Sequence, residues 1–311
     1  MQPGELKAIL EAEYGFSISG ISPAPRQFVA ETFYVDAEGG ARYFCKVVEK
    51  PLFVPTIIAG LPALAELHGL GQERIGYPIR KAGGGLYAQR GRQIVVLYNR
   101  IDAPQSYGYD FFTLGSLLGE IHALTPRITA KIPAESFRFD HRALFEDQFA
   151  TALAGRDGGE LNREFQRVMQ AHEEQIRGDF ALLNTLVDQI DPSEFDLVLT
   201  HGDAGGNVLV KSPTDIYIVD WDEILLAPKE RDLWVLKHEP GFLEGYRSVL
   251  PGAEVNEQAR RFCILNQYFY YLLHYFGEQF GERPEEHKWA MLEELAGFFD
   301  GWTKRYTESV K

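Results

Sequence analysis

The segment 197–210, LVLTHGDAGGNVLV, and the segment 216–234, IYIVDWDEILLAPKERDLW, carry the most information about the fold. In the first segment, two apolar runs of strand-like residues flank a polar turn that contains Asp203 and Asn207. In the second, a short apolar strand leads directly into Asp220. Neighbouring strand ends are therefore expected to present three oxygen-bearing side chains close together.

These three side chains suit metal-assisted chemistry on phosphate. Asp and Asn oxygens are the hard ligands that Mg²⁺ prefers, usually with phosphate oxygens completing the shell. A carboxylate beside them can orient a hydroxyl and accept its proton, as phosphoryl transfer to an alcohol requires. Taken singly, each residue also suits a structural turn, because Asp and Asn favour turns through local hydrogen bonds. Their combination with Lys46, at the end of a strand in a β-rich segment, favours the catalytic interpretation.

The rest of the chain divides into a β-rich part and a helical part. Strand-like runs at 32–35 and 43–48 surround a turn, a helix is expected over 56–68, and a second hairpin comprises 86–89 and 94–98. Apolar residues then recur every three or four positions, which predicts helices at 111–124, 144–153, 161–176 and 180–190 and around 262–276. The predicted fold class is α+β and bilobal, with an antiparallel β-rich lobe at 1–98, a hinge at 99–105 and a larger, mostly helical lobe at 106–311.

Composition limits the partners of the protein. The 311 residues are 45% hydrophobic and 24% charged, which excludes a disordered or collagen-like chain. The net charge of −14 disfavours nucleic acid and anionic membranes and favours cationic small molecules. Cys45 and Cys263 lie far apart without metal-like spacing, so we expect buried free thiols and a cytoplasmic location. There is no signal-peptide pattern and no apolar stretch of ~20 residues, which predicts a soluble protein. The oligomeric state stays open.

The chain resembles a known family through a small set of motifs. The turn 201–203, Asn207 and the strand end 220–222 resemble those of the aminoglycoside phosphotransferase and choline kinase family, the small-molecule relatives of eukaryotic-type protein kinases. The segment 227–234, APKERDLW, is similar to that of spectinomycin and aminoglycoside kinases in particular. The resemblance implies a bilobal protein-kinase-like fold, ATP and Mg²⁺ as cofactors, and transfer of phosphate to an alcohol group.

The resemblance also implies roles for individual residues in the second half of the chain. Asp203 matches the catalytic aspartate that positions the acceptor hydroxyl and takes its proton. Asn207 and Asp220 match the two residues that hold the metal. His201 is expected to brace the turn without a chemical step, and Asp232 is expected to be a structural ion-pair or capping residue.

Nucleotide-binding residues are implied in the first hundred residues. Lys46 matches the strand lysine that pairs with the α- and β-phosphates. The backbone carbonyl of Asn99 and the N–H of Ile101 match the hinge groups that hold adenine. The segment 23–31 occupies the place of the phosphate-covering loop, where the amides of residues 28–31 are candidates to reach phosphate. Neither a P-loop nor a G-x-G-x-x-G fingerprint is present in the sequence.

Two departures from the kinase pattern leave questions open. The kinase loop has five steps between its Asp and Asn, whereas Asp203 and Asn207 are four steps apart. We therefore expect Gly205 or Gly206 to adopt a backbone conformation that forbids a Cβ. The helix glutamate that should pair with Lys46 is also missing, since the predicted helix offers only a late candidate, Glu66.

The sequence supports more than one acceptor. The first hypothesis is an ATP-dependent O-phosphotransferase acting on a small, cationic, aminoglycoside-like molecule. The alternatives are a kinase of another alcohol, such as choline, a sugar or homoserine, and an inactive nucleotide-binding relative. Four acidic residues are candidate contacts for an amine, or else a solvated helix face: Glu278, Glu282, Glu285 and Glu286.

Overall fold

The computed structural model describes residues 1–25, 30–50, 53–156, 159–234 and 236–301, which form two compact units. The first unit comprises 1–135, 196–232 and 236–254, and the second comprises the described residues of 136–195, 233–235 and 255–311. The predicted lobe boundary at 98–106 lies inside the first unit, so the division into lobes stays a prediction.

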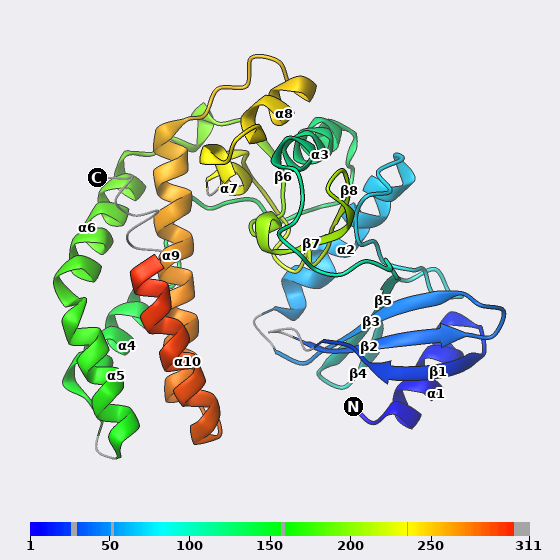
Figure 1. The fold of residues 1–311 in the computed structure, drawn as a ribbon, viewed down its shortest axis with the longest axis horizontal. Coiled ribbons are helices and arrows are strands. Elements are labelled where there is room, and N and C mark those ends of the chain that lie inside the picture. Colours follow the sequence, from blue (N-terminus) through cyan, green and yellow to red (C-terminus); the bar gives the residue numbers. More distant parts are fainter. Residues whose placement is uncertain (26–29, 51–52, 157–158, 235, 302–311) are drawn as a thin grey trace. The chain divides into compact units, whose positions relative to one another are not determined.

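The first unit contains an antiparallel five-stranded sheet (Figure 1). Its strands are β1 (Ile18–Pro23), β2 (Ala30–Ala37), β3 (Arg42–Val48), β4 (Ala88–Arg90) and β5 (Gln93–Asn99), in the order β1-β2-β3-β5-β4. The predicted hairpins are present, with β2 pairing β3 and β4 pairing β5. The prediction of an α+β protein that begins with an antiparallel β-rich segment is confirmed.

One face of this sheet is covered by helix α1 (Pro3–Tyr14). Apolar side chains of α1 form a buried core with residues of the sheet, among them Leu6, Leu10, Val35, Cys45, Val47 and Leu97. Successive side chains of a strand point to opposite faces. Lys46, which lies between Cys45 and Val47, therefore points away from α1 and toward the other face of the sheet.

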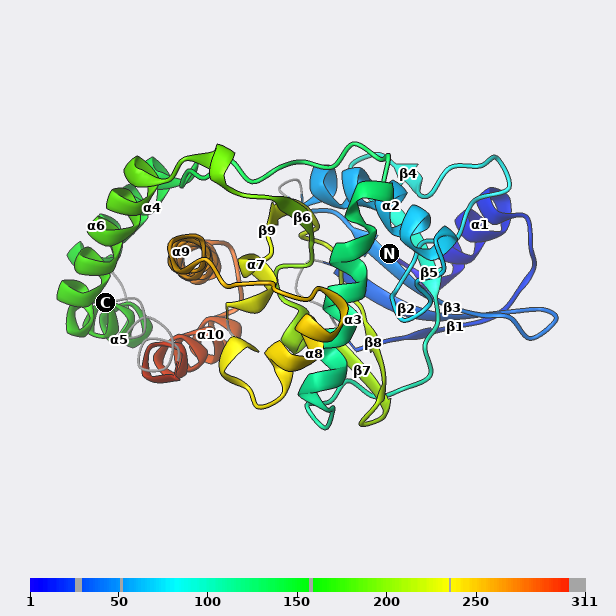
Figure 2. The same ribbon diagram turned by 90° about the horizontal axis from the view of Figure 1, so that it is seen from above.

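Helices α2 (Val54–Gly69), α3 (Phe111–Leu124) and α8 (Phe242–Val249) complete the helical part of the first unit. Helix α3 packs closely along α8 (Figure 2), and glycines make this approach possible. A Cβ added at Gly115 would lie 2.0 Å from the carbonyl oxygen of Phe242, and one at Gly245 would lie 1.9 Å from that of Phe112. Only residues without a side chain fit at these two positions.

Two short antiparallel sheets of two strands each follow in the same unit. Strand β6 (Leu197–Thr200) pairs with β9 (Leu225–Pro228), and β7 (Val208–Ser212) pairs with β8 (Asp215–Ile218). Strand β9 was not anticipated. The segment after β9 forms the short helix α7 (Glu230–Leu233).

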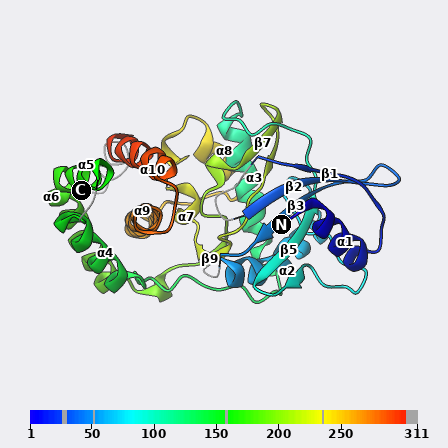
Figure 3. The same ribbon diagram turned by 90° about the horizontal axis from the view of Figure 1, so that it is seen from below.

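The second unit is a group of helices, α4 (Arg142–Ala154), α5 (Glu160–Ala171), α6 (Glu173–Gln189), α9 (Glu257–Phe280) and α10 (Glu285–Phe298). Figure 3 views α9 nearly end-on, with the other helices around it. The aromatic stripe of α9 is core, with the rings of Phe269 and Phe145 4.8 Å apart. The single helix predicted over 161–176 is wrong, because α5 ends at Ala171 and α6 begins at Glu173.

Two further expectations concern the cysteines and membranes. Cys45 and Cys263 are buried, and neither forms a disulfide, as predicted. Across the described ranges, none of the helices combines the length and the apolar character that crossing a membrane requires.

Candidate active site

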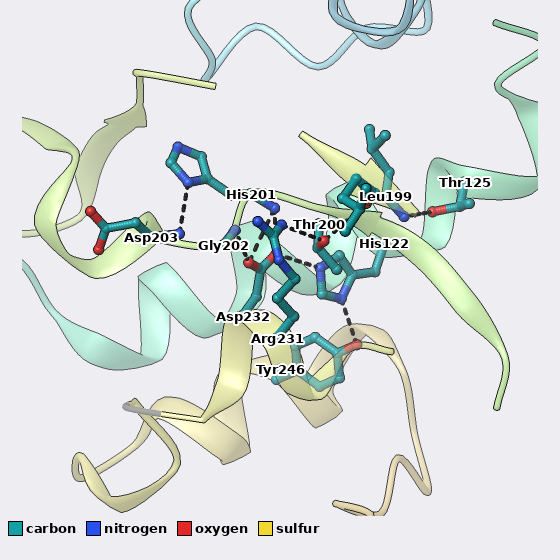
Figure 4. Close-up of polar contacts among 11 residues, drawn as sticks. His122, Thr125, Leu199, Thr200, His201, Gly202, Asp203, Arg231, Asp232 and Tyr246 are labelled. Atoms are coloured by element: carbon teal, nitrogen blue, oxygen red, sulfur yellow. Dashed lines mark hydrogen bonds and ion pairs between the residues drawn. The ribbon is translucent and has the colours of Figure 1, made fainter. Parts of the chain in front are cut away.

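The 201–207 turn between β6 and β7 is fixed from below by Asp232 (Figure 4). This carboxylate is buried and accepts the backbone N–H of His201 at 2.9 Å and that of Gly202 at 2.6 Å. It also lies 3.0 Å from Nε2 of His122. Burial alone would raise the pKa of Asp232, but the hydrogen bond and charge of His122 lower it. Asp232 is thus a structural carboxylate that caps the turn, as expected.

His201 links the turn to the end of β8. Its Nδ1 accepts the backbone N–H of Asp203 at 3.1 Å, and its Nε2 lies 2.8 Å from the carbonyl oxygen of Val219. With one nitrogen accepting and the other donating, the ring suits the neutral form. Burial lowers the pKa of His201, which favours the same form. The expected bracing role of His201 agrees with these contacts.

Arg231 supports the turn on its other side. Its guanidinium donates to Oγ1 of Thr200 at 2.9 Å and to the carbonyl oxygen of Glu223 at 3.0 Å. Gly202 has a φ of +95°, and a Cβ added there would lie 2.4 Å from Nη2 of Arg231. The glycine before Asp203 is therefore required both by backbone conformation and by the arginine packed beneath it.

Asp203 and Asn207 are brought together by the short turn. The side-chain amide of Asn207 donates to the carbonyl oxygen of Asp203 at 2.9 Å and to Oδ2 of Asp203 at 3.1 Å. The backbone N–H of Val219 donates to the carbonyl oxygen of Asn207 at 2.9 Å. Because Asp220 follows Val219, the three predicted residues meet at the ends of neighbouring strands.

The expectation for Gly205 and Gly206 is wrong. Residues 204–206 form a single 3₁₀ turn, and neither glycine has a φ in the left-handed region. Among the residues of this turn and the end of β8, the left-handed region is adopted by Gly202, with a φ of +95°, and by Asp220, with a φ of +68°. The chain thus turns sharply before Asp203 and again at Asp220, and the missing residue between Asp203 and Asn207 is accommodated by the tighter helical turn.

Two residues that the sequence did not indicate also hold this loop. The hydroxyl of Tyr109 donates to the carbonyl oxygen of Gly205 at 2.8 Å, and the amide of Gln105 donates to that of Gly206 at 2.5 Å. Burial raises the pKa of Tyr109 to about 12, so the phenol keeps its proton at neutral pH. Both residues lie in an irregular segment before α3, and nothing in their spacing predicts these contacts.

Asp203 has the properties of a proton acceptor near neutral pH. Desolvation, followed by the charges of Glu223 and Asp220, raises the pKa of Asp203 to about 7. Its side chain nevertheless reaches solvent, so a small molecule can approach it. A carboxylate with a pKa near the working pH is well matched to receive a proton from a hydroxyl.

Lys46 is buried, with 3% of its surface exposed, and it contacts two carboxylates. Its ammonium forms an ion pair with Asp220 and lies 2.8 Å from Oδ1 of Asp222. Burial alone would lower the pKa of Lys46, but the two carboxylates raise it above its usual range. The same ammonium lowers the pKa of Asp220 against the effect of burial. Burial, with Asp220 nearby, raises the pKa of Asp222.

Glu66, the late candidate partner of Lys46, is used elsewhere. Its carboxylate accepts the backbone N–H of Thr129 at 2.6 Å, the hydroxyl of Thr129 at 2.8 Å and the N–H of Ala130 at 3.2 Å. The sequence indicated Asp222 only as part of the strand-end motif 220–222. Its contact with Lys46 is a tertiary feature, since 176 positions separate the two residues.

The predicted hinge is fastened to the neighbouring segment 75–77. The side chain of Asn99 accepts the N–H of Tyr77 at 2.7 Å and donates to the carbonyl oxygen of Ile75 at 3.3 Å. In the part of the chain that the structure describes, the backbone N–H of Ile101 donates no hydrogen bond. The segment 26–29, which includes part of the predicted phosphate-covering loop, lies outside the described residues.

The acidic residues proposed as amine contacts have different surroundings. Glu278 is buried and binds Arg283 at 2.8 Å and His287 at 2.9 Å, so its carboxylate is used within the second unit. Glu282, Glu285 and Glu286 are exposed. Glu278 is therefore a structural residue. For the other three, both interpretations stay open, a contact with an amine and a solvated helix face.

Several solved structures with this fold are small-molecule kinases. A spectinomycin phosphotransferase in complex with ADP and spectinomycin is 22% identical, with 97% of this chain and 96% of that chain covered and a TM-score of 0.76. A microcompartment-associated aminopropanol kinase is 16% identical, with 99% and 98% covered and a TM-score of 0.66. The amicoumacin kinase hAmiN in complex with AMP-PNP, Ca²⁺ and Ami is 14% identical, with 96% and 93% covered and a TM-score of 0.64. No curated protein matches the sequence.

The family itself is identified from the sequence. Residues 20–263 match the phosphotransferase enzyme family, a match that includes the five-stranded sheet, Lys46, the 201–207 turn and Asp220. The solved structures agree with it in fold across nearly the whole chain. The chain therefore belongs to the phosphotransferase enzyme family, the small-molecule kinases that its motifs predicted.

Proposed function

We propose that the protein transfers the γ-phosphate of ATP to a hydroxyl group of a small, cationic molecule. The observation that carries the proposal is the convergence of Asp203, Asn207 and Asp220 with Lys46 in one compact unit. The four residues come from β3, the 201–207 turn and the end of β8. Val219 joins the turn to the end of β8 through hydrogen bonds on both its carbonyl and its N–H. A convergence of this kind is required by phosphoryl transfer and has no simpler structural explanation.

In this proposal each residue has one task. Asp203 orients the acceptor hydroxyl and takes its proton, which its raised pKa favours. Lys46 pairs with the nucleotide phosphates, and the Asn99 carbonyl and the Ile101 N–H hold adenine. Bound Mg²⁺ supplies charge neutralisation on the phosphates during transfer.

Asn207 and Asp220 are suitable Mg²⁺ ligands. In the described ranges, no group of three or more His, Cys, Asp and Glu side chains is arranged to hold a metal ion by itself. Mg²⁺ in kinases needs no such group, because it is usually held by one or two protein oxygens together with substrate phosphates and water. The amide nitrogen of Asn207 is occupied by Asp203, so its oxygen is the atom left for a metal. Asp220 supplies the carboxylate.

A cationic acceptor is favoured by charge. The chain carries a net charge of −14, and the carboxylates of Glu223 and Asp220 act on Asp203. Such surroundings favour an ammonium group near the reacting hydroxyl. Proteins of the same fold include a spectinomycin phosphotransferase, an aminopropanol kinase and a protein solved in complex with GDP and kanamycin. Aminopropanol is the smallest of these three amines. Choline, a sugar or homoserine stay as alternatives. The absence of a disulfide between the two buried cysteines agrees with a cytoplasmic enzyme.

A panel of acceptors tests the proposal. Purified protein is incubated with MgATP or MgGTP and with aminoglycosides, spectinomycin, amino alcohols, choline, sugars and homoserine, and nucleoside diphosphate release is followed by a coupled assay. We expect acceptor-dependent release with at least one amine-bearing alcohol, and a fall of ~10²-fold or more in Asp203→Asn. Nucleotide binding without turnover on any acceptor would favour the inactive relative. Turnover on an uncharged sugar alone would contradict the cationic acceptor.

A further inference from the structure

The buried ammonium of Lys46 needs a partner that carries negative charge. Only 3% of the residue is exposed, and a buried charge is stable only when it is paired. Two carboxylates meet it, one from Asp220 and one from Asp222, the latter at 2.8 Å. Asp220 is the proposed metal ligand, and a carboxylate that faces a divalent cation has less charge to share with a lysine. Asp222 is the carboxylate without a second task.

Helix α2 does not provide this partner. Its sequence contains one acidic residue, Glu66, and that carboxylate accepts three hydrogen bonds from Thr129 and Ala130. The earlier helix positions where a carboxylate would be expected carry Ile57 and Ile58. The usual arrangement of a strand lysine with a helix glutamate is therefore not available to this chain.

The surroundings of Asp222 fit a dedicated partner of the lysine. The residue is 6% exposed, and its Oδ1 is the atom that meets Lys46. Its Oδ2 is buried and has no hydrogen-bond partner within the described residues. A buried carboxylate is costly unless it is paired. The ammonium of Lys46 is the only full positive charge that the described contacts bring to Asp222.

We infer that Asp222 is the positioning residue of Lys46, and that it holds the ammonium toward the nucleotide phosphates in place of a helix glutamate. This inference rests on the proposed function. It means that the position of Lys46 depends on the segment after β8, which also carries Asp220, and does not depend on helix α2.

The test is a double-mutant cycle on nucleotide binding. Asp222→Asn, Lys46→Met and the double variant are compared with the wild type by calorimetry, using ADP and adenosine in EDTA, so that no metal contributes. If Asp222 acts through Lys46, Asp222→Asn weakens ADP binding about tenfold, leaves adenosine unchanged, and has no further effect in the Lys46→Met background. Asp222→Glu, which keeps the charge, is the second variant if Asp222→Asn lowers the folded fraction seen by circular dichroism.

Glu66→Gln is the matched control, since it removes the one carboxylate of α2, and its ADP affinity should equal that of the wild type. An equal loss of ADP affinity in Glu66→Gln would show that helix α2 positions Lys46, and would overturn the inference. So would a change of ADP affinity by Asp222→Asn that persists beside Lys46→Met, because Asp222 would then act on ADP without Lys46. A variant that binds ADP normally in EDTA but loses the gain from added Mg²⁺ would make Asp222 a metal ligand.

The two proposals fail in different ways. If the wild type binds ADP no better than adenosine with or without Mg²⁺, the proposed function fails. If the wild type prefers ADP and Asp222→Asn binds ADP as tightly as the wild type does, with and without Mg²⁺, only the role of Asp222 is wrong.

Discussion

Two glycines of the 201–207 turn differ in whether the backbone at their position can carry a side chain. Gly202 has a φ of +95°, and a Cβ added there would lie 2.4 Å from Nη2 of Arg231. Gly206 has no left-handed φ, and a Cβ there would lie 3.5 Å from the carboxylate of Asp203, an ordinary contact. The first position forbids a side chain, whereas the second accepts one.

We therefore expect Gly202→Ala to lower the free energy of unfolding by about 1–3 kcal/mol and to reduce kcat strongly, because it displaces Asp203. Gly206→Ala is the control and should stay within about 1 kcal/mol of the wild type. Urea unfolding and steady-state kinetics measure both. A larger loss in Gly206→Ala than in Gly202→Ala would show that the turn has a different conformation.

The raised pKa of Asp203 predicts how its substitution changes stability with pH. The carboxyl has a pKa of about 7 in the folded protein and near the ordinary aspartate value of 3.8 when unfolded. Between these values the folded state binds more protons, so stability falls as pH rises through that window. Asparagine has no such proton to lose.

In metal-free protein, Asp203→Asn should accordingly be more stable than the wild type at pH 8, and this gain should shrink toward pH 4.5. We expect no more than roughly 1 kcal/mol, since the side chain reaches solvent and its charge is screened. Thermal melting across this pH range measures the difference. A gain that grows as pH falls would reverse the sign of the shift.

At the scale of elements, the short loop depends on the segment that leads into α3. The hydroxyl of Tyr109, which is buried, donates to the carbonyl oxygen of Gly205 at 2.8 Å. A hydrogen bond of this kind contributes about 1 kcal/mol. Tyr107, two positions earlier, is 78% exposed and provides a matched control.

Tyr109→Phe should lower stability by about 1 kcal/mol and lower kcat several-fold, because the carbonyl of Gly205 loses its donor and Asp203 and Asn207 lie on either side of it. Tyr107→Phe should change neither quantity. Kinetics with saturating MgATP and chemical unfolding provide the two readouts. If the two variants behave alike, the loop does not depend on Tyr109.

At the scale of the whole molecule, all the proposed nucleotide and metal residues fall in the first compact unit. A ligand that binds only the folded state stabilises the part that holds it, by ~2.7 kcal/mol at 100 times its dissociation constant. MgADP should therefore slow hydrogen exchange mainly in residues 30–50, 75–105 and 197–222. Mass spectrometry of peptides with and without MgADP measures this. Protection confined to α5 and α10 of the second unit would place the nucleotide elsewhere.

Several features of the protein follow from the sequence alone, because they depend on local patterns. Alternating and continuous apolar runs predicted the β2–β3 and β4–β5 hairpins, and apolar residues at helical spacing predicted α3 and the buried face of α9. The family was identifiable from the 201–207 turn and the strand end at Asp220. The break between α5 and α6 was missed, since the helical pattern continues through His172.

The partners of the site residues were decided only by tertiary structure. The sequence indicated Lys46 but not Asp222, and it offered Glu66, which the fold directs to Thr129 and Ala130. The strain that was expected at Gly205 and Gly206 lies at Gly202 and Asp220. Side-chain periodicity reports which residues are buried on a local element, whereas ion pairs between residues more than 170 positions apart depend on how the strands come together.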